Sequence, residues 1–241
     1  MARVLMILLG LLLSGVFGTS VGVSQTGVDP ARLQFTISTE KETFLVGEPV
    51  RLLFRLKNLT DKDMTSDFWL SFDFDRLRVW ISGDGGRSFE PYVSMAMKIA
   101  SEKKRGRALV TIKAGESIEA FEYISFNTET NGFAFPHQGR YLIKVTLFYN
   151  FFGQRLDSNT VDILVVKPTG VDESALSFIT NNGLEYFLTP EARLFPYDDN
   201  TVRRLKEFVG LFPESTYRPF AELALQAMCK GRFDLPSCTE P

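Results

Sequence analysis

The chain offers few side chains that could catalyse a reaction, and His137 is its only histidine. A hydrolytic triad needs a nucleophile and an orienting acid placed around such a base. His137 instead stands in the turn-like stretch Phe135-Pro-His-Gln-Gly139, and the sequence contains no nucleophile elbow, phosphate-binding loop, dinucleotide fingerprint or zinc-protease motif. We therefore interpret His137 as a turn residue and predict that the protein is not an enzyme and uses no cofactor.

Four aspartates around a predicted hairpin are the next candidates: Asp67, Asp73, Asp75 and Asp84. Hard cations bind several carboxylate and carbonyl oxygens at once. The spacing of these residues matches no calcium loop, so we interpret them as a solvated face and predict no metal site. A hydrolase built on two carboxylates, in a cleft between two domains, is the least favoured of our three functional hypotheses.

Aromatic side chains are concentrated in one segment and give the candidate binding site: Phe148, Tyr149, Phe151 and Phe152. The segment spans a predicted turn, and the alternation of a strand cannot bury all four rings. Contiguous exposed apolar groups usually mark an interface. Two interpretations stay open. In the first, the rings form a surface that contacts a partner. In the second, which we favour, the C-terminal helices pack on the rings as their seat.

Cys229 and Cys238 are the only cysteines. In an oxidising compartment they can form a disulfide that joins the last helix to the tail. Two free thiols remain the alternative. A zinc site is less favoured, because the Cys-x8-Cys spacing is wide and the chain has one histidine.

The first residues predict a cleaved signal peptide. Arg3 is followed by the apolar run Val4–Phe17 and then by small residues. The run is shorter than the ~20 residues that span a bilayer as a helix, although an uncleaved anchor stays open. We assign residues 1–24 to the signal and 25–32 to a linker. The protein is thus predicted to be secreted or periplasmic, with no membrane span after cleavage.

The body of the chain, residues 33–168, alternates apolar and polar residues with a period of two. Such alternation is typical of strands with one buried face. The alternating segments are 33–37, 50–57, 77–81, 141–147 and 161–165, and turn signals separate them at 46–49, 83–86, 114–116 and 138–140. The pattern predicts a mainly β, antiparallel sandwich.

Three stretches resemble bacterial immunoglobulin-like domains: Phe44–Asn58 with its Gly-Glu-Pro turn, Ile112–Ser117, and Pro136–Tyr141 leading into Leu-Ile-Lys-Val. Asp157–Val166 is similar to their final strand. The resemblance covers roughly residues 33–168 and implies an immunoglobulin-like β-sandwich with Tyr141 at a corner of the fold. It says little about function, because such sandwiches have many roles.

Residues 169–241 change to a helical period and are expected to form a small helical domain. Helices are expected over 172–181, over 200–212 with Asp199 or Asn200 as cap, and from 213 to 228 with Ser215 as cap. The stretch 205–225 resembles the helix junction of a tetratricopeptide-like repeat. A single repeat cannot bury a continuous core, so it should dock on the sandwich or on a partner.

The net charge of −2 gives no indication of nucleic-acid binding. Our first hypothesis is a non-enzymatic binding or adaptor protein that contacts another envelope or secreted protein. The second is a carbohydrate or cell-wall binding module, for which Trp69 and Trp80 would have to be exposed.

Overall fold

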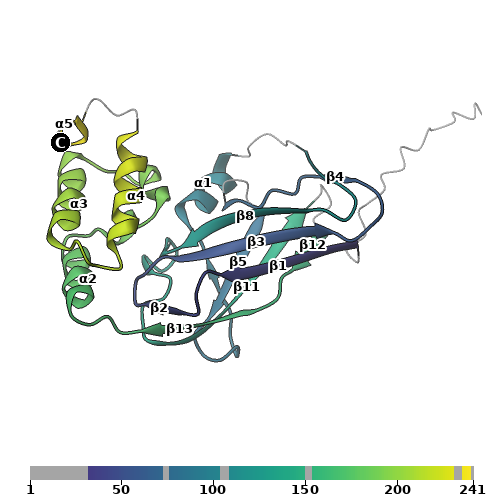
Figure 1. Cartoon of the computed structure of the whole chain (residues 1–241), viewed down its shortest axis with the longest axis horizontal. Coiled ribbons are helices and arrows are strands. Elements are labelled where there is room, and N and C mark those ends of the chain that lie inside the picture. The colour runs from purple at the N-terminus through teal and green to yellow at the C-terminus, as the bar shows by residue number, and fades with distance from the viewer. Residues whose placement is uncertain (1–31, 73–75, 104–108, 150–153, 231–234, 240–241) are drawn as a thin grey trace, which may run out of the picture.

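The computed structural model describes residues 32–72, 76–103, 109–149, 154–230 and 235–239. Within them, two β-sheets pack face to face around one apolar core, and helices follow the last strand (Figure 1). The smaller sheet has the order β1 (Leu33–Thr39), β3 (Val50–Asn58), β8 (Ser117–Ile124). The larger sheet has the order β2 (Thr43–Leu45), β13 (Val161–Val166), β11 (Gly139–Tyr149), β5 (Leu77–Ser82), β6 (Glu90–Tyr92), and β12 (Gln154–Asp157) pairs with β11. Two short pairs lie beside them: β4 (Met64–Ser66) with β7 (Val110–Ile112), and β9 (Phe126–Asn127) with β10 (Gly132–Phe133).

The period of two in the sequence corresponds to strands with one buried face. In β1 the buried residues are Leu33, Phe35 and Ile37, and the residues between them are more exposed. β3, β11 and β13 show the same alternation. The prediction of a mainly β fold with two packed sheets is therefore confirmed.

One strand pair departs from the antiparallel prediction, because β2 runs parallel to β13. The chain leaves β1 in the smaller sheet, joins the larger sheet as β2 and returns to the smaller sheet as β3. The turn after β2 depends on Gly47, whose φ of 77° favours glycine. The buried Glu48 carboxylate accepts from the Leu45 amide at 2.9 Å and from Lys41 Nζ at 2.6 Å. The Gly-Glu-Pro turn thus switches the chain between sheets.

Tyr141 lies at the start of β11 and fixes the turn before it. Its hydroxyl donates to the carbonyl oxygen of His137 at 3.0 Å, and its ring packs edge-on against Phe135. His137 itself is exposed. The structure therefore places His137 in a turn, as we interpreted it from the sequence.

A helix that the sequence analysis did not expect lies between β6 and β7. α1 spans Met95–Lys103, and Ser94 Oγ accepts from the Met97 amide at 3.2 Å at its start. The segment reads Met-Ala-Met-Lys-Ile-Ala-Ser-Glu-Lys, which is rich in helix-forming residues. The sequence analysis assigns residues 33–168 to the sandwich and expects no helix there, because a single short helix gives little periodicity.

The C-terminal residues form the helical unit. Its elements are α2 (Val171–Asn181), η3 (Glu185–Phe187), η4 (Pro190–Leu194), α3 (Asp199–Leu211), α4 (Arg218–Cys229) and α5 (Pro236–Thr239). Two predicted caps were wrong. Asp198 caps α3 by accepting from the Thr201 amide at 2.8 Å. The turn before α4 is held by Asp172 of α2, which accepts from Ser215 Oγ at 2.8 Å and from the Thr216 amide at 2.7 Å.

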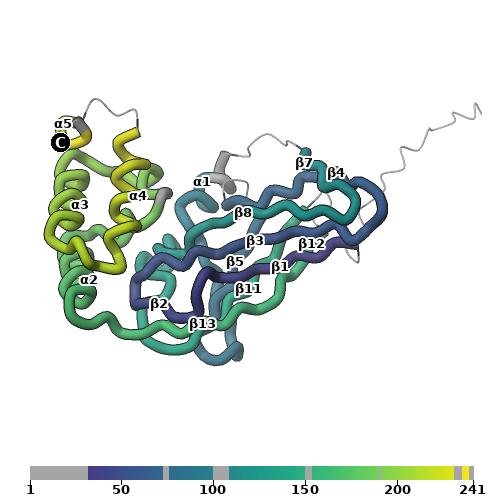
Figure 2. Tube along the Cα trace, in the orientation of Figure 1, coloured from purple at the N-terminus to yellow at the C-terminus, as the bar shows by residue number. Residues whose placement is uncertain are grey.

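The helical unit packs on one end of the sandwich, next to β2 and the end of β13 (Figure 2). The Tyr217 side chain is fully buried there, and its hydroxyl donates to the carbonyl oxygen of Val46 at 2.6 Å. Nearby, the rings of Phe126 and Tyr186 lie 4.3 Å apart. Polar and aromatic contacts therefore join the two units at the same end of the sandwich.

Candidate functional site

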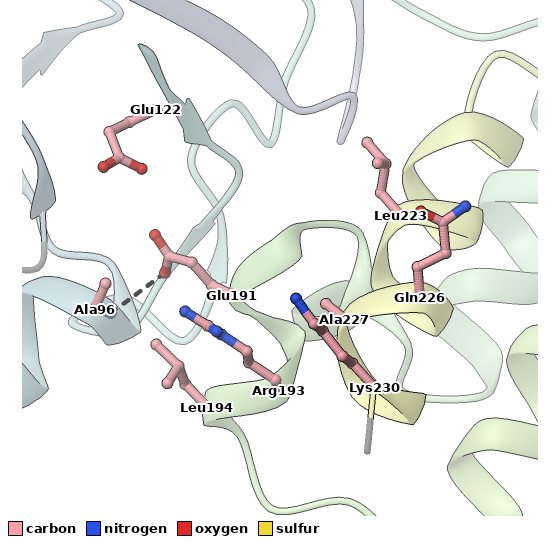
Figure 3. Close-up of a pocket in the computed structure, with 9 residues that line it drawn as sticks. All are labelled: Ala96, Glu122, Glu191, Arg193, Leu194, Leu223, Gln226, Ala227 and Lys230. Atoms are coloured by element: carbon pink, nitrogen blue, oxygen red, sulfur yellow. Dashed lines mark hydrogen bonds between the residues drawn. The ribbon is translucent and has the colours of Figure 1, made fainter. Parts of the chain in front are cut away.

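A cleft of about 430 Å³ opens between the sandwich and the helical unit (Figure 3). We call it the interdomain cleft. Its lining includes Ala96 of α1, Glu122 of β8, Glu191 and Arg193 of η4, Leu223 of α4, and Lys230 after α4. The volume falls within the range of small-molecule sites, about 300–1,000 Å³.

Glu122 and Glu191 form the acidic side of the interdomain cleft. Glu191 Oε2 accepts from the Ala96 amide near the start of α1 at 3.3 Å, and Glu122 Oε1 accepts from the Phe72 amide at 3.1 Å. Burial, then Glu191, and to a smaller extent Glu122 raise the pKa of the Tyr92 phenol well above its usual range. Both carboxylates therefore lie close enough to the same buried ring for their charges to act on it.

Arg193 and Lys230 form the basic side. Figure 3 shows Lys230 extending from the end of α4 toward Arg193, and Arg193 extending from η4 toward the place where Glu191 meets α1. Within the part of the chain that the structure describes, neither side chain forms an ion pair or a hydrogen bond. Their charges are therefore available to an incoming group.

An apolar surface borders the interdomain cleft, and we call it the aromatic rim: Phe121, Tyr123, Phe220 and Leu223. The rings of Phe121 and Tyr123 lie 6.0 Å apart edge to face, and Tyr123 and Phe220 repeat this geometry at 6.0 Å. Phe121 is 48% exposed and Leu223 is 36% exposed. Phe220 and Leu223 are three residues apart on α4, so they share a helix face. The rim thus extends from the outer face of β8 onto α4.

Arg51 of β3 completes the sandwich side of this surface. Its guanidinium carbon lies 4.0 Å from the centre of the Phe121 ring, within the range of a cation–π interaction. The stacking orders the Phe121 ring although nearly half of it is exposed. Such an ordered exposed ring loses little entropy when a partner covers it.

Of the four aromatic residues that the sequence analysis grouped as a binding site, the two that the structure describes differ in their surroundings. Tyr149 is fully buried and its ring packs against Phe68 at 5.6 Å. Phe148 is half-buried, with the Arg78 guanidinium 5.9 Å from its ring. Phe151 and Phe152 lie outside the described residues.

The favoured interpretation of this segment as the seat of the helices was wrong for its described part. β11 begins near the helical unit and ends with Phe148 and Tyr149, and β12, which pairs with that end, lies at the opposite end of the sandwich (Figure 1). The helices instead contact Leu45, Phe126 and Phe133. The sequence could not indicate which end of β11 the helices would cover.

A second groove, of about 440 Å³, lies on the outer face of the larger sheet. Trp80, Pro91 and Phe148 supply its apolar surface, and Arg78 and Glu129 supply opposite charges. Trp80 and Trp69 are both half-buried. Only Trp80 lines this groove. The carbohydrate-binding hypothesis requires both tryptophans to be exposed, and neither side chain is fully exposed.

The acidic candidates do not form one site. Asp67 is buried and forms an ion pair with Arg76, so its assignment to a solvated face was wrong. Asp84 holds the hairpin turn: hydrogen bonds from Ser82 and Ser88 lower the pKa of its carboxyl far below the usual range. Asp73 and Asp75 lie outside the described residues. Among the residues that are described, no three His, Cys, Asp or Glu side chains are grouped as metal ligands would be.

Cys229 and Cys238 are joined by a disulfide between the end of α4 and α5. The bond closes a short loop, since the two residues are nine positions apart. Tyr197 supports the same region, because its hydroxyl donates to the carbonyl oxygen of Met228 at 2.8 Å. Of the helices in the described ranges, none is long and apolar enough to cross a bilayer.

Sequence reasoning missed the residues of the interdomain cleft and its rim. One face of β8 has Phe121 and Tyr123 beside Glu119. The other face includes the apolar residues Ile118, Ala120 and Ile124. A strand that is apolar on both faces is a signal of additional contact, and it was available in the sequence. No comparable signal existed for Glu191 and Arg193, because a short 3₁₀ helix has no diagnostic period.

Comparisons with known proteins find no matching family model and no matching curated protein. Among solved structures, the chain is similar to a Pseudomonas fluorescens alkylpurine DNA glycosylase (12% identity, TM-score 0.34) over 56% of this chain and 30% of that one. It is also similar to a β-glucosidase from Erythrobacter marinus (11%, 0.33), covering 56% of this chain and 15% of that one. A CARDB domain from Pyrococcus furiosus (14%, 0.31) matches over 57% of this chain and 96% of its own. These TM-scores are too low to bear on what the chain binds or catalyses.

Proposed function

We propose that the protein is a non-enzymatic binding protein that holds another protein through the aromatic rim of its interdomain cleft. The observation that carries this proposal is the continuous surface of Phe121, Tyr123, Phe220 and Leu223, which spans both structural units and remains partly exposed. Aromatic residues, and arginines such as Arg51 beside them, are enriched where proteins bind one another. We retain the secreted or periplasmic location as part of the proposal.

The architecture supports a scaffold for binding. The strand order, with β2 beside β13 and a tyrosine corner at Tyr141, is that expected for an immunoglobulin-like sandwich. The packed pair α3 and α4 supports the tetratricopeptide-like interpretation of the helical unit. β8 is the edge strand of its sheet, and an edge strand is a surface along which an extended segment of a partner can add.

The test is capture of the partner by a variant that alters only the rim. Mature protein carrying Leu223→Gln is used as bait in a crosslinking pull-down from a native envelope extract, beside the wild type. The matched control is Leu211→Gln, because Leu211 is also an exposed leucine of the helical unit, 57% exposed, and lies outside the rim. We expect Leu223→Gln to lose the captured protein and Leu211→Gln to retain it. Equal capture by both folded variants would refute the proposal.

Carbohydrate binding is the second candidate, and the Trp80 groove favours it. An indole ring beside Phe148 gives a flat surface for a sugar ring, and Arg78 and Glu129 offer groups for its hydroxyls. We expect Trp80→Ala to reduce retention on insoluble wall material if this candidate is correct. The control is Trp69→Ala, since Trp69 does not line the groove. Unchanged retention of Trp80→Ala would remove the candidate.

A further inference from the structure

The hydrogen-bond ladder of the smaller sheet determines which backbone groups of β8 face β3. The Asn58 amide donates to the Glu116 carbonyl oxygen at 2.9 Å, so these residues form a directly bonded pair. The Leu59 amide donates to the Arg32 carbonyl oxygen at 2.9 Å, which assigns the odd-numbered residues of β3 to β1. Bonded and unbonded pairs alternate along an antiparallel ladder. The residues of β8 that bond β3 are therefore the even-numbered ones: Ile118, Ala120, Glu122 and Ile124.

The odd-numbered residues of β8 direct their amide and carbonyl groups to the open edge of the sheet. No other described strand pairs with β8 on that side (Figure 1). The Tyr123 carbonyl oxygen accepts from the Tyr92 hydroxyl at 3.5 Å, so the open edge ends there. The backbone groups of Glu119 and Phe121 have no hydrogen-bond partner on the open edge within the described residues. Each of these two residues therefore offers one donor and one acceptor to an added strand.

The side chains at the same two positions define what such a strand should carry. Phe121 is 48% exposed and belongs to the aromatic rim. The Glu119 side chain is 67% exposed and forms an ion pair with Arg55 of β3 at 3.5 Å. A strand beside β8 would place its own side chains directly opposite, roughly 4.5–5.5 Å away. An apolar residue suits the position opposite Phe121, and a basic residue suits the position opposite Glu119.

We infer that the partner supplies an extended segment that adds to β8 as an antiparallel strand, with an apolar residue opposite Phe121 and a basic residue opposite Glu119. The inference rests on the proposed function, because it names the part of the partner that reaches the aromatic rim. In strand addition, main-chain hydrogen bonds give affinity and alternate side chains give specificity. An unpaired edge strand is a ready template for this kind of pairing.

The first experiment titrates the purified chain with a probe peptide, acetyl-Thr-Val-Thr-Val-Thr-Lys-Thr-amide, by calorimetry. When the second valine lies opposite Phe121, the lysine lies opposite Glu119, and we expect saturable binding. Methylating the nitrogen of that valine removes the N–H that would donate to the Phe121 carbonyl oxygen, so binding should weaken about tenfold or more. Methylating the nitrogen of the threonine that follows is the matched control. That N–H faces away from β8, so affinity should change by about twofold at most.

Hydrogen exchange, measured residue by residue, locates the bound probe. In the free chain the amides of Glu119 and Phe121 should exchange rapidly, whereas the Ala120 amide, which bonds β3, should exchange slowly. Saturating probe should slow exchange at Glu119 and Phe121 by about tenfold or more. Slow exchange at Phe121 in a concentrated free sample that is lost on dilution would assign the edge to a second copy of the chain and overturn the inference.

Glu119→Pro removes one amide of the open edge and leaves the bonds between β8 and β3 in place. This variant should bind the probe about tenfold or more weaker. Glu119→Ala is its control: it loses only the carboxylate, so the probe should bind about threefold weaker. Urea midpoints equal to that of the wild type check that both variants fold. The methylated peptides need no variant, so the test does not depend on the proline substitution.

Absence of saturable probe binding would overturn the inference, and so would equal affinity for the two methylated peptides. Either failure is distinguishable from failure of the proposed function, which Leu223→Gln tests in partner capture. If Leu223→Gln loses the partner while the probe does not bind, the rim proposal stands and strand addition is refuted. If the probe binds as expected while both leucine variants capture the partner equally, strand addition to β8 stands and the rim proposal is refuted.

Discussion

Replacing Tyr217 by phenylalanine removes one oxygen atom and with it a hydrogen bond between the helical unit and the sandwich. The Tyr217 hydroxyl donates to the Val46 carbonyl oxygen at 2.6 Å, and the tyrosine side chain is fully buried. Phenylalanine keeps the ring and its packing. The substitution therefore isolates a polar contact between two parts of the chain that are far apart in sequence.

The expected loss of stability depends on whether the Val46 carbonyl oxygen finds another hydrogen-bond donor. A net hydrogen bond contributes about 0.5–1.5 kcal/mol to stability, and a stranded buried partner costs about 1–3 kcal/mol. Because Val46 is only half-buried, water can reach part of the space, so we expect the free energy of unfolding to fall by about 1–2 kcal/mol. For a chain of this size that corresponds to roughly 2–8 °C in Tm.

Urea unfolding of the purified protein, followed by fluorescence and by far-UV circular dichroism, measures the change. The control is Tyr123→Phe, since the Tyr123 hydroxyl forms no hydrogen bond within the described residues. The control should stay within about 0.5 kcal/mol of the wild type. A loss for Tyr217→Phe no larger than that of the control would refute the view that this hydroxyl stabilises the docked helices.

Three further predictions concern stability. Burial raises the pKa of Tyr92, so the unfolded chain ionises this phenol near pH 10 while the folded chain does not. The free energy of unfolding should therefore fall as the pH rises above about 10. In urea titrations between about pH 9 and 11, Tyr92→Phe should make this fall shallower. Replacing Cys229 and Cys238 by serine opens a loop of nine-residue separation and should cost about 2–3 kcal/mol by loop entropy, measured against the wild type with and without reductant. Asp172→Ala removes the carboxylate that holds the turn before α4 and should cost about 1–2 kcal/mol in the same assay, whereas Asp172→Asn should recover part of the loss; equal effects of the two substitutions would contradict the assigned role.

Much of the fold could be predicted because its signals are local. The alternation of Leu33, Phe35 and Ile37 marks a half-buried strand wherever that strand packs. The same holds for α3, whose buried Val202, Leu205 and Phe208 follow a helical spacing. The bounds of α2 and α3 accordingly agree with the sequence expectation to within one residue.

The relations between elements could not be predicted, because they depend on contacts that no local pattern encodes. The sequence predicts Asp67 to be a surface residue, but it is buried and forms an ion pair with Arg76, which no local pattern indicates. The turn before α4 is held by Asp172, which lies on a helix much earlier in the chain. The interdomain cleft has the same origin: it exists only where η4 and α4 face α1 and β8, so its residues are scattered in the sequence.

The walls of the interdomain cleft belong to two units, and this has a thermodynamic consequence for anything that occupies it. An occupant contacts both walls only when the helices are docked, so occupancy and docking are linked equilibria. A ligand at one hundred times its dissociation constant would add about 2.7 kcal/mol to the docked state. That is more than the loss we expect from Tyr217→Phe, so saturating ligand would restore docking in that variant. In the absence of ligand, the docked state would be less populated in this variant than in the wild type. Every partner of the interdomain cleft would therefore bind the variant more weakly.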